Sequence, residues 1–109
     1  MIDKPILSIC IPTYKRWKLL CETLDTLVCQ FKHKEISDKV EIVISNNDSP
    51  DNTDELIKPY VDKYSNIKYY KNDKNLWSAV NVIKVTEHAT GEYLWLITDD
   101  DCTTQFSLK

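Results

Sequence analysis

The sequence predicts an α/β protein: a three-layer α/β/α domain built on a mostly parallel, Rossmann-like sheet. Four short apolar runs of strand length alternate along the chain with three segments whose apolar residues recur at helical spacing. Such an alternation produces parallel strands that are covered by helices on both faces. Polar clusters follow three of the four runs, where the strands would end. The length of 109 residues suits one domain or a portion of one.

Each predicted strand is a short apolar run with a turn signal behind it. Residues 7–11 form the first strand, which Pro12 is expected to stop because proline cannot donate to a sheet ladder. Residues 40–44 form the second strand, which ends in the turn-forming sequence SNNDSPDNT. Residues 66–70 form a third strand near an edge of the sheet, and the run GEYLWLI forms the fourth.

Three helices are expected between these strands. In the first, apolar residues recur at spacings of three and four: Trp17, Leu20, Cys21, Leu24, Leu27, Val28 and Phe31. A polar loop, 32–39, follows it. The second helix has Asp51 as a plausible N-cap and one apolar face: Leu56, Ile57, Tyr60, Val61 and Tyr64. The third covers about 77–89, and Gly91 suits the left-handed position after its end.

Composition excludes several classes of protein. Apolar residues make up 42% and charged residues 28%, as in an ordinary globular protein. The net charge of −3, with no cluster of lysine and arginine, argues against nucleic acid as a partner. No signal peptide or transmembrane stretch is evident, and four cysteines without a C-x-x-C pair favour a reducing cytoplasm. The single glycine excludes a Walker A loop and a G-x-G-x-x-G loop.

The polar clusters predict a ligand site at one end of the sheet. They read PTYKR after the first strand, SNNDS after the second and TDDD after the fourth. In open parallel sheets ligands bind beyond the carboxyl ends of the strands. Three aspartates alone would more often begin a solvated loop, but two further clusters on the same rim favour a site. Carboxylates held at a strand end suit Mg²⁺ or Mn²⁺, and Tyr14 offers a stacking surface for a base.

Four stretches in this order and spacing resemble the N-terminal half of a family 2 glycosyltransferase of the GT-A fold. They are SICIPTYKRWKLLCETLDTL, VEIVISNNDSPDNTDELI, NIKYYKNDKNLWSAVN and ATGEYLWLITDDD. The last is most similar to bacterial transferases that build surface polysaccharide, including the abequosyltransferase-like group. The resemblance implies transfer of a sugar from a nucleotide-diphosphosugar to a glycan or lipid-linked acceptor, assisted by Mg²⁺ or Mn²⁺. It also implies a location in the cytoplasm or at the inner face of the membrane, with which the protein could associate peripherally.

The resemblance also assigns residues to the donor site. The loop that contacts the base and ribose is matched by Pro12, Thr13, Tyr14 and Arg16. Asn47 matches a position where many members carry an aspartate that accepts a hydrogen bond from uracil N3. Because an amide can accept or donate, Asn47 leaves the base open. Asp99 would lie toward the ribose, Asp100 would ligate the metal that bridges the two phosphates, and Asp101 would contact the metal or its water.

Members of this family continue well beyond the metal motif, whereas this chain ends at Lys109. Residues 1–109 are therefore expected to be a single donor-binding portion of a GT-A domain, without the acceptor-binding half. The catalytic base of inverting members belongs to that half, and no residue here matches it. We expect residues 1–109 alone to bind nucleotide without transferring sugar. A homodimer could cover apolar surface meant for the second half.

Two other interpretations fit parts of the sequence. A haloacid-dehalogenase-like phosphatase would use the D-x-D-x-T pattern with Asp99 as nucleophile and Asp101 as acid and base. That motif usually opens its fold, however, and here it stands near the end of the chain. A non-catalytic module could instead pack against a partner through an unfinished sheet edge.

Overall fold

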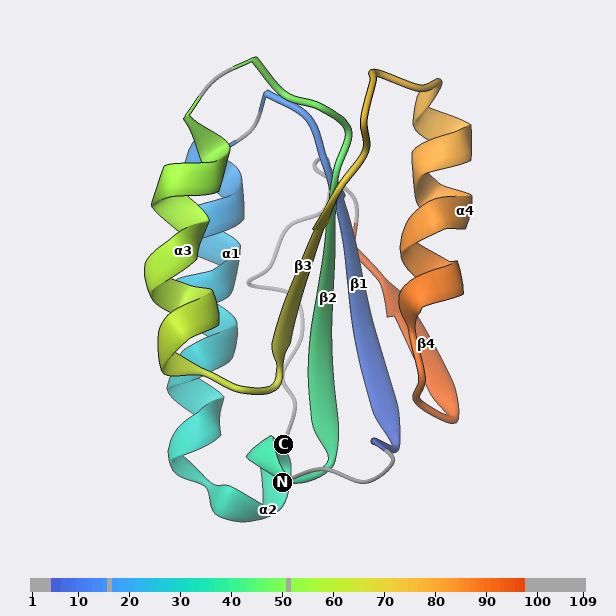
Figure 1. The fold of residues 1–109 in the computed structure, drawn as a ribbon. Helices are drawn as coiled ribbons and strands as arrows, with labels where there is room; N and C mark the ends of the chain where they lie inside the picture. Colours follow the sequence, from blue (N-terminus) through green and yellow to red (C-terminus); the bar gives the residue numbers. More distant parts are fainter. Residues whose placement is uncertain (1–4, 16, 51, 98–109) are drawn as a thin grey trace.

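The computed structural model describes residues 5–15, 17–50 and 52–97. Its elements, in chain order, are β1 (Leu7–Thr13), α1 (Trp17–Val28), η1 (Cys29–Lys32), α2 (Lys34–Ser37), β2 (Val40–Asn46), α3 (Thr53–Lys63), β3 (Ile67–Lys71), α4 (Ser78–His88) and β4 (Tyr93–Leu96). The four strands form one sheet in the order β3-β2-β1-β4, and all its pairs are parallel. The α/β class and the edge position of the third strand are confirmed (Figure 1).

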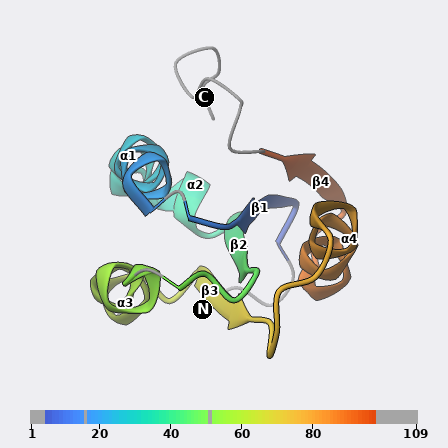
Figure 2. The same ribbon diagram turned by 90° about the horizontal axis from the view of Figure 1, so that it is seen from above.

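Helices cover both faces of the sheet, as the alternating pattern predicts. α1 and α3 lie side by side on one face, and α4 lies on the other against β1 and β2 (Figures 1 and 2). No helix in the described part of the chain has both the length and the apolar character needed to span a membrane. The three-layer arrangement is confirmed.

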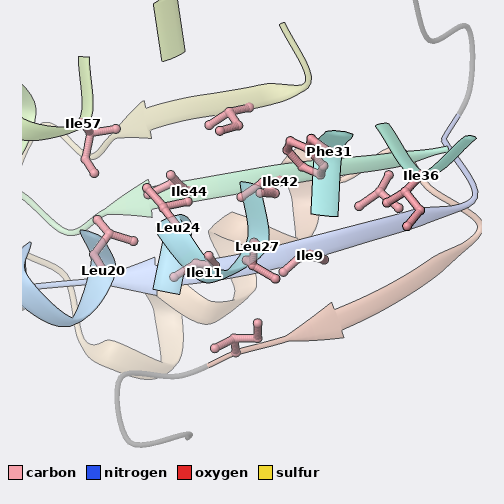
Figure 3. Packing of buried hydrophobic residues seen from close by; sticks show 13 residues of the cluster. Ile9, Ile11, Leu20, Leu24, Leu27, Phe31, Ile36, Ile42, Ile44 and Ile57 are labelled. Carbon is pink, nitrogen blue, oxygen red and sulfur yellow. The ribbon is translucent and has the colours of Figure 1, made fainter. Parts of the chain in front are cut away.

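The main core fills the space between the sheet and the α1–α3 layer. Ile9 and Ile42 are completely buried there, beside Leu27 of α1 (Figure 3). On the opposite face a smaller cluster joins Cys10 and Val43 to Val85 of α4, and all three are completely buried. Neighbouring residues of β1 and β2 thus face opposite layers. Burial on both faces explains why these strands are continuous apolar runs.

The prediction that Pro12 ends the first strand was wrong, since β1 continues to Thr13. Backbone groups of a strand point alternately toward its two neighbours. Cys10 O accepts from Ile97 N on the β4 side, whereas Thr13 O accepts from Asn47 N on the β2 side, each at 2.9 Å. The nitrogen of Pro12 therefore faces the β4 side, beyond the last register pair there, Cys10↔Leu96. No described register pair requires an N–H from Pro12.

The first helix packs on the sheet with the apolar face that its sequence predicts, but one residue of that face is exposed. Leu20, Leu24 and Leu27 are buried, whereas Trp17, for which core packing is the default expectation, is 40% exposed at the start of α1. The segment predicted as a polar loop contains the short helix α2. Its Ile36 is buried in the main core cluster, so this segment contributes an apolar side chain to the core.

The second helix begins one residue later than its predicted cap implies. α3 starts at Thr53 with Asn52 at the N-cap position, while Asp51 lies outside the described residues. The Asn52 side chain makes no capping hydrogen bond, but its carbonyl accepts from Leu56 N at 3.2 Å. Ile57 is buried, so the predicted apolar face is the packed one. Pro59 lies within α3.

Gly91 is required for a different reason from the predicted one. Its φ is not positive, so it is not a left-handed cap. A Cβ built on it would instead lie 2.7 Å from Ser8 Oγ, 2.8 Å from Ser8 N and 3.0 Å from Leu7 C. Gly91 N also donates to Ser8 Oγ at 2.8 Å. The glycine therefore allows the connection before β4 to lie directly against β1.

A buried carboxylate joins this connection to the rest of the sheet. Glu41 is 1% exposed, and its Oε2 accepts from Ser8 Oγ at 2.5 Å, Thr90 N at 2.7 Å and Thr90 Oγ1 at 3.0 Å. Its Oε1 lies 2.8 Å from Lys68 Nζ of β3. Burial raises the pKa of Glu41, but the hydrogen bonds from Lys68, Ser8 and Thr90 outweigh burial and hold this pKa below its ordinary value.

The cysteines of the described part are free thiols in three different environments. Cys10 is buried, Cys21 is half-buried and Cys29 is exposed. Burial raises the pKa of the Cys10 thiol to about 11. Cys10 is therefore protonated at neutral pH and serves as a small apolar core residue.

Candidate functional site

The carboxyl ends of β1 and β2 meet at one rim of the sheet, as predicted. The connections that follow β1, β2 and β3 all lie at this end of the molecule (Figure 1). Asn47 N, the first residue after β2, donates to Thr13 O at the end of β1 at 2.9 Å. This bond holds the end of β1 beside the turn that follows β2.

Two of the predicted base-contacting residues belong to the strand and not to a loop. Pro12 and Thr13 are the last residues of β1, and both are buried. Thr13 is 2% exposed, and its Oγ1 has no hydrogen-bond partner within the described residues. Leaving a buried hydroxyl unpaired costs about 1–3 kcal/mol. Thr13 thus holds an unused donor and acceptor directly beneath the rim.

The turn after β1 is fixed by contacts with the turn after β2. Lys15 has a positive φ of 54°, and its N–H donates to Ser49 Oγ at 3.0 Å. Its Nζ lies 5.3 Å from the centroid of the half-buried Tyr14 ring, a cation–π contact. This side of the rim therefore presents an aromatic ring with a cation beside it. Arg16 lies outside the described residues.

Asn46 shapes the second turn, the role that asparagines after a strand usually have. Its Oδ1 accepts from Ser49 N at 2.9 Å, and its Nδ2 donates to Tyr69 Oη at 2.8 Å. The Tyr69 hydroxyl donates in turn to Asp54, which also accepts from Lys71 Nζ at 2.8 Å. Lys71, and then Tyr69, hold the pKa of Asp54 below its ordinary value. These contacts tie the turn to α3 and β3.

Asn47, the predicted base-reading residue, is engaged with the connection between β3 and α4. It is 4% exposed, and its Nδ2 donates to Leu76 O at 2.6 Å. Its Oδ1 accepts from Leu76 N at 2.8 Å and from Asn72 Nδ2 at 3.1 Å. The structure thus places Asn47 at the rim, with its amide paired to a backbone peptide.

Two further asparagines, neither of them among the predicted site residues, complete this network. Asn72 Nδ2 also donates to Asn81 Oδ1 at 2.9 Å. Asn81, on α4, accepts from Ser45 Oγ at 2.8 Å and donates to Ser45 O at 3.1 Å. The only sequence signal is the number of asparagines between 72 and 81, which does not reveal their pairing.

An open groove of about 510 Å³ lies on the other side of this connection, against α4. Its lining includes Asn72 and Leu76, so the segment that pairs with Asn47 also forms one wall of the groove. Lys71, Lys84 and His88 line it as well, and the His88 ring stacks on Tyr70 at 3.7 Å between centroids. The groove is accordingly more basic than the protein as a whole.

The predicted ligands of the metal and ribose, Asp99, Asp100 and Asp101, lie outside the described residues. Within the part of the chain that the structure describes, no three histidine, cysteine, aspartate or glutamate residues are grouped to hold a metal ion. β4 runs parallel to β1, and Ile97, 2% exposed, donates from its N–H to Cys10 O at 2.9 Å. The last described residue is therefore fixed beside β1, two residues before Asp99.

Replacing Asn47 with aspartate is expected to lower the free energy of unfolding by about 1–2 kcal/mol. Asn47 Nδ2 donates to Leu76 O at 2.6 Å, and a carboxylate oxygen in its place would face this carbonyl without a hydrogen to donate. Urea denaturation measures the loss. Asn75→Asp is the matched control, since Asn75 is exposed in the same connection. An Asn47→Asp protein as stable as the Asn75→Asp protein would contradict the importance of this pairing.

Comparison with known proteins places this architecture in a family. Residues 8–108 match glycosyl transferase family 2. An uncharacterized glycosyltransferase of Mycoplasma pneumoniae is 34% identical over 90% of this chain and 32% of its own length. The abequosyltransferase RfbV of Salmonella typhimurium is 36% identical over 94% of this chain and 30% of its own. The chain spans about a third of the length of these relatives.

The fold agrees with these similarities. The mannosyltransferase PcManGT from Pyrobaculum calidifontis, solved with GDP-Man and Mn²⁺, superimposes with a TM-score of 0.74 at 22% identity, over 89% of this chain and 28% of that protein. The likeness is one of fold, and it confirms the GT-A architecture that the sequence motifs imply. Because the match extends from β1 through β4 and includes both turns of the rim, the chain belongs to glycosyl transferase family 2.

Proposed function

We propose that this chain is the donor-binding portion of a glycosyltransferase that takes a sugar from a nucleotide-diphosphosugar. The observation that carries the proposal is the rim itself: two polar turns held together by Asn47 N and Thr13 O, in a chain matched to the family over residues 8–108. The unpaired Thr13 hydroxyl and the Tyr14 ring beside Lys15 are suitable partners for a nucleoside. The structural relative from Pyrobaculum calidifontis was solved with such a donor, GDP-Man.

In this proposal Tyr14 and Arg16 contact the base and ribose, Asp99 approaches the ribose, and Asp100 with Asp101 holds Mg²⁺ or Mn²⁺. Carboxylate oxygens are the ligands these ions prefer. The bound ion would neutralise the charge of the departing diphosphate. The protein residues orient the nucleotide, and the rim rests on the buried end of β1 and on the buried Ile97 that follows β4.

The acceptor is proposed to be a glycan or a lipid-linked glycan of a bacterial surface polysaccharide, in the cytoplasm or at the inner face of the membrane. The similarity to the abequosyltransferase of Salmonella typhimurium supports this choice. The phosphatase interpretation is not carried further, because the chain belongs to glycosyl transferase family 2.

Thermal unfolding of the chain with UDP, GDP, CDP and dTDP, each with and without MnCl₂, tests the proposal. At a nucleotide concentration a hundredfold above Kd, we expect a metal-dependent stabilisation of roughly 2.7 kcal/mol. A double substitution, Asp100→Asn with Asp101→Asn, should abolish the metal dependence. Asp38→Asn, which changes an exposed aspartate after α2, should not. The donor-site proposal fails if no nucleotide stabilises the chain, or if the double variant keeps its response to manganese.

A further inference from the structure

α4 presents apolar side chains on the side that faces away from the sheet. Trp77, at its N-cap, is 84% exposed, Ile83 is 57% exposed and Val80 is 40% exposed. The three are spaced three residues apart, so they follow one another along the helix. α4 lies at the periphery of the molecule, with no described element outside it (Figures 1 and 2). The described part of the chain therefore leaves this apolar row uncovered.

Two lysines lie beside the apolar row. Lys74 precedes α4 and Lys84 follows Val80 by one turn, and both are exposed side chains that line the groove together with Val80. Neither forms an ion pair with a described residue, whereas Lys71, in the same groove, is paired with Asp54. Together with the apolar row, Lys74 and Lys84 form what we call the α4 outer face.

The composition of the α4 outer face suits a lipid surface better than a protein partner. Tryptophan is enriched where proteins meet the boundary between membrane and water. Lysine is depleted in protein–protein interfaces, whereas anionic headgroups attract it, and its long stem lets the ammonium reach them while its neighbours go deeper. Binding of a helix to a membrane surface grows with the apolar area inserted and with the attraction to anionic lipid. The α4 outer face offers both.

We propose that the α4 outer face docks the protein on a membrane surface that carries anionic lipid. Trp77, Val80 and Ile83 enter the boundary between headgroups and acyl chains. Lys74 and Lys84 lie against the lipid phosphates. This surface is separate from the donor site, so docking does not require a bound nucleotide.

Docking through this face also brings the donor site close to the membrane, a consequence that rests on the proposed function. Trp77 directly follows Leu76, whose peptide pairs with the Asn47 amide at the rim. The connection between β3 and α4 lies at the same end of the molecule as the turns of the rim (Figure 1). A lipid-linked acceptor is confined to the membrane surface, so docking would keep donor and acceptor within reach of each other.

Co-sedimentation with vesicles tests the charged part of the face. The chain is expected to bind vesicles of phosphatidylcholine and phosphatidylglycerol in equal parts, to bind phosphatidylcholine alone weakly, and to be released by salt, which screens the lysines. Lys74→Gln with Lys84→Gln should weaken binding about thirtyfold, which is about fivefold for each lysine near an anionic surface. Lys18→Gln with Lys32→Gln, at exposed positions of α1 and η1, is the charge-matched control and should bind like the wild type.

Trp77→Ala tests the apolar part of the face. It should weaken binding at least about tenfold, the effect of withdrawing one large apolar side chain from the membrane. The tryptophan emission of the wild type should shift to the blue when anionic vesicles are added, and Trp77→Ala should lose this shift. Trp17→Ala is the matched control, since Trp17 is 40% exposed on α1, and it should keep both the affinity and the shift.

Two acids near the face oppose docking, and removing one of them should strengthen it. Asp73 precedes Lys74, and Glu87 is exposed one turn beyond Ile83 and Lys84. Glu87→Gln is expected to tighten binding to anionic vesicles about fivefold. Glu22→Gln, at an exposed position of α1, should leave binding unchanged. A disturbance of α4 would weaken binding instead, so a gain identifies the charge as the cause.

The other occupants of this face give different results. Equal binding to both kinds of vesicle, wild-type binding by the lysine double variant, or an equal loss in Trp77→Ala and Trp17→Ala would overturn the inference. Release of the chain from vesicles by inorganic phosphate at constant ionic strength would show a soluble-anion site instead. A dimer in sedimentation velocity without vesicles, dissociated by Trp77→Ala, would show an interface between copies. Because Trp77 is 84% exposed, thermal unfolding of this variant should match that of the wild type.

The docking inference and the proposed function fail separately. If anionic vesicles do not bind the chain, the inference falls, while the stabilisation by nucleotide and manganese is unaffected. If no nucleotide stabilises the chain but the vesicle results are as expected, docking stands and only its consequence for the acceptor falls.

Discussion

Replacing Glu41 with glutamine is expected to lower the free energy of unfolding by about 2–3 kcal/mol, because it disturbs a buried acceptor of several hydrogen bonds. The carboxylate is 1% exposed and accepts from Ser8 and Thr90. The ion pair with Lys68 adds little to this figure, since the Lys68 side chain is 41% exposed and solvent screens its charge. The effect is large because these contacts join β1 and β2 to the connection that precedes β4.

Urea denaturation at neutral pH measures this loss, and its pH dependence identifies the cause. Because the folded-state pKa of Glu41 is lowered, its stabilisation is complete above the ordinary carboxyl pKa. It is lost as the pH falls through the folded-state pKa. The difference between wild type and Glu41→Gln should therefore shrink on acidification. Glu22→Gln, at an exposed position of α1, is the control. A difference that does not change with pH would argue against an ionised Glu41.

Replacing Gly91 with alanine is expected to cost about 2–3 kcal/mol, because the added methyl has no space to occupy. Its Cβ would approach Ser8 N to 2.8 Å and Leu7 C to 3.0 Å, and backbone atoms in the middle of a sheet cannot yield. The connection would have to move away from β1, which would also stretch the 2.8 Å hydrogen bond from Gly91 N to Ser8 Oγ.

Amide exchange along β4, together with urea denaturation, tests this substitution. In the Gly91→Ala protein, the backbone N–H groups of Trp95 and Ile97 should lose more protection from exchange than those of β2. Only the β4 edge of the sheet would be displaced. Glu92→Ala is the matched control: it also introduces alanine into this connection, but at an exposed position. Equal stability of the Gly91→Ala and Glu92→Ala proteins would show that the connection has room for a methyl group.

The layers of the fold could be predicted from sequence because local patterns determine them. The apolar runs around Ile9 and Ile42 and the leucine spacing of the first helix each identify one element, and their alternation determines the parallel sheet. The position of the rim follows from the same rule, since turns after parallel strands share one end. The roles of Pro12 and Gly91 could not be predicted this way. They depend on which neighbouring strand a backbone group faces and on how closely two segments approach.

The identity of the rim residues was only partly predictable for a similar reason. Thr13 and Asn47 stand at strand ends, where the turn signals indicate them. Asn72 and Asn81 meet Asn47 and Ser45 only after the third strand and the last helix are in place. An asparagine near a turn has many ordinary uses, and its amide polarity is fixed by partners distant in sequence.

The strand order has a consequence for how the protein is made. Of the described strands, β1 leaves the ribosome first, whereas β4, its partner on one side, leaves last, with Leu7 paired to Tyr93. During synthesis one edge of β1 stays open while β2, β3 and α4 are added, and open strand edges favour pairing with other chains. Pro12 lies on that same side of β1 and offers no N–H to a foreign strand. Pro12, which β1 accommodates near the rim, therefore withholds one hydrogen-bond donor from a foreign strand while this edge is open.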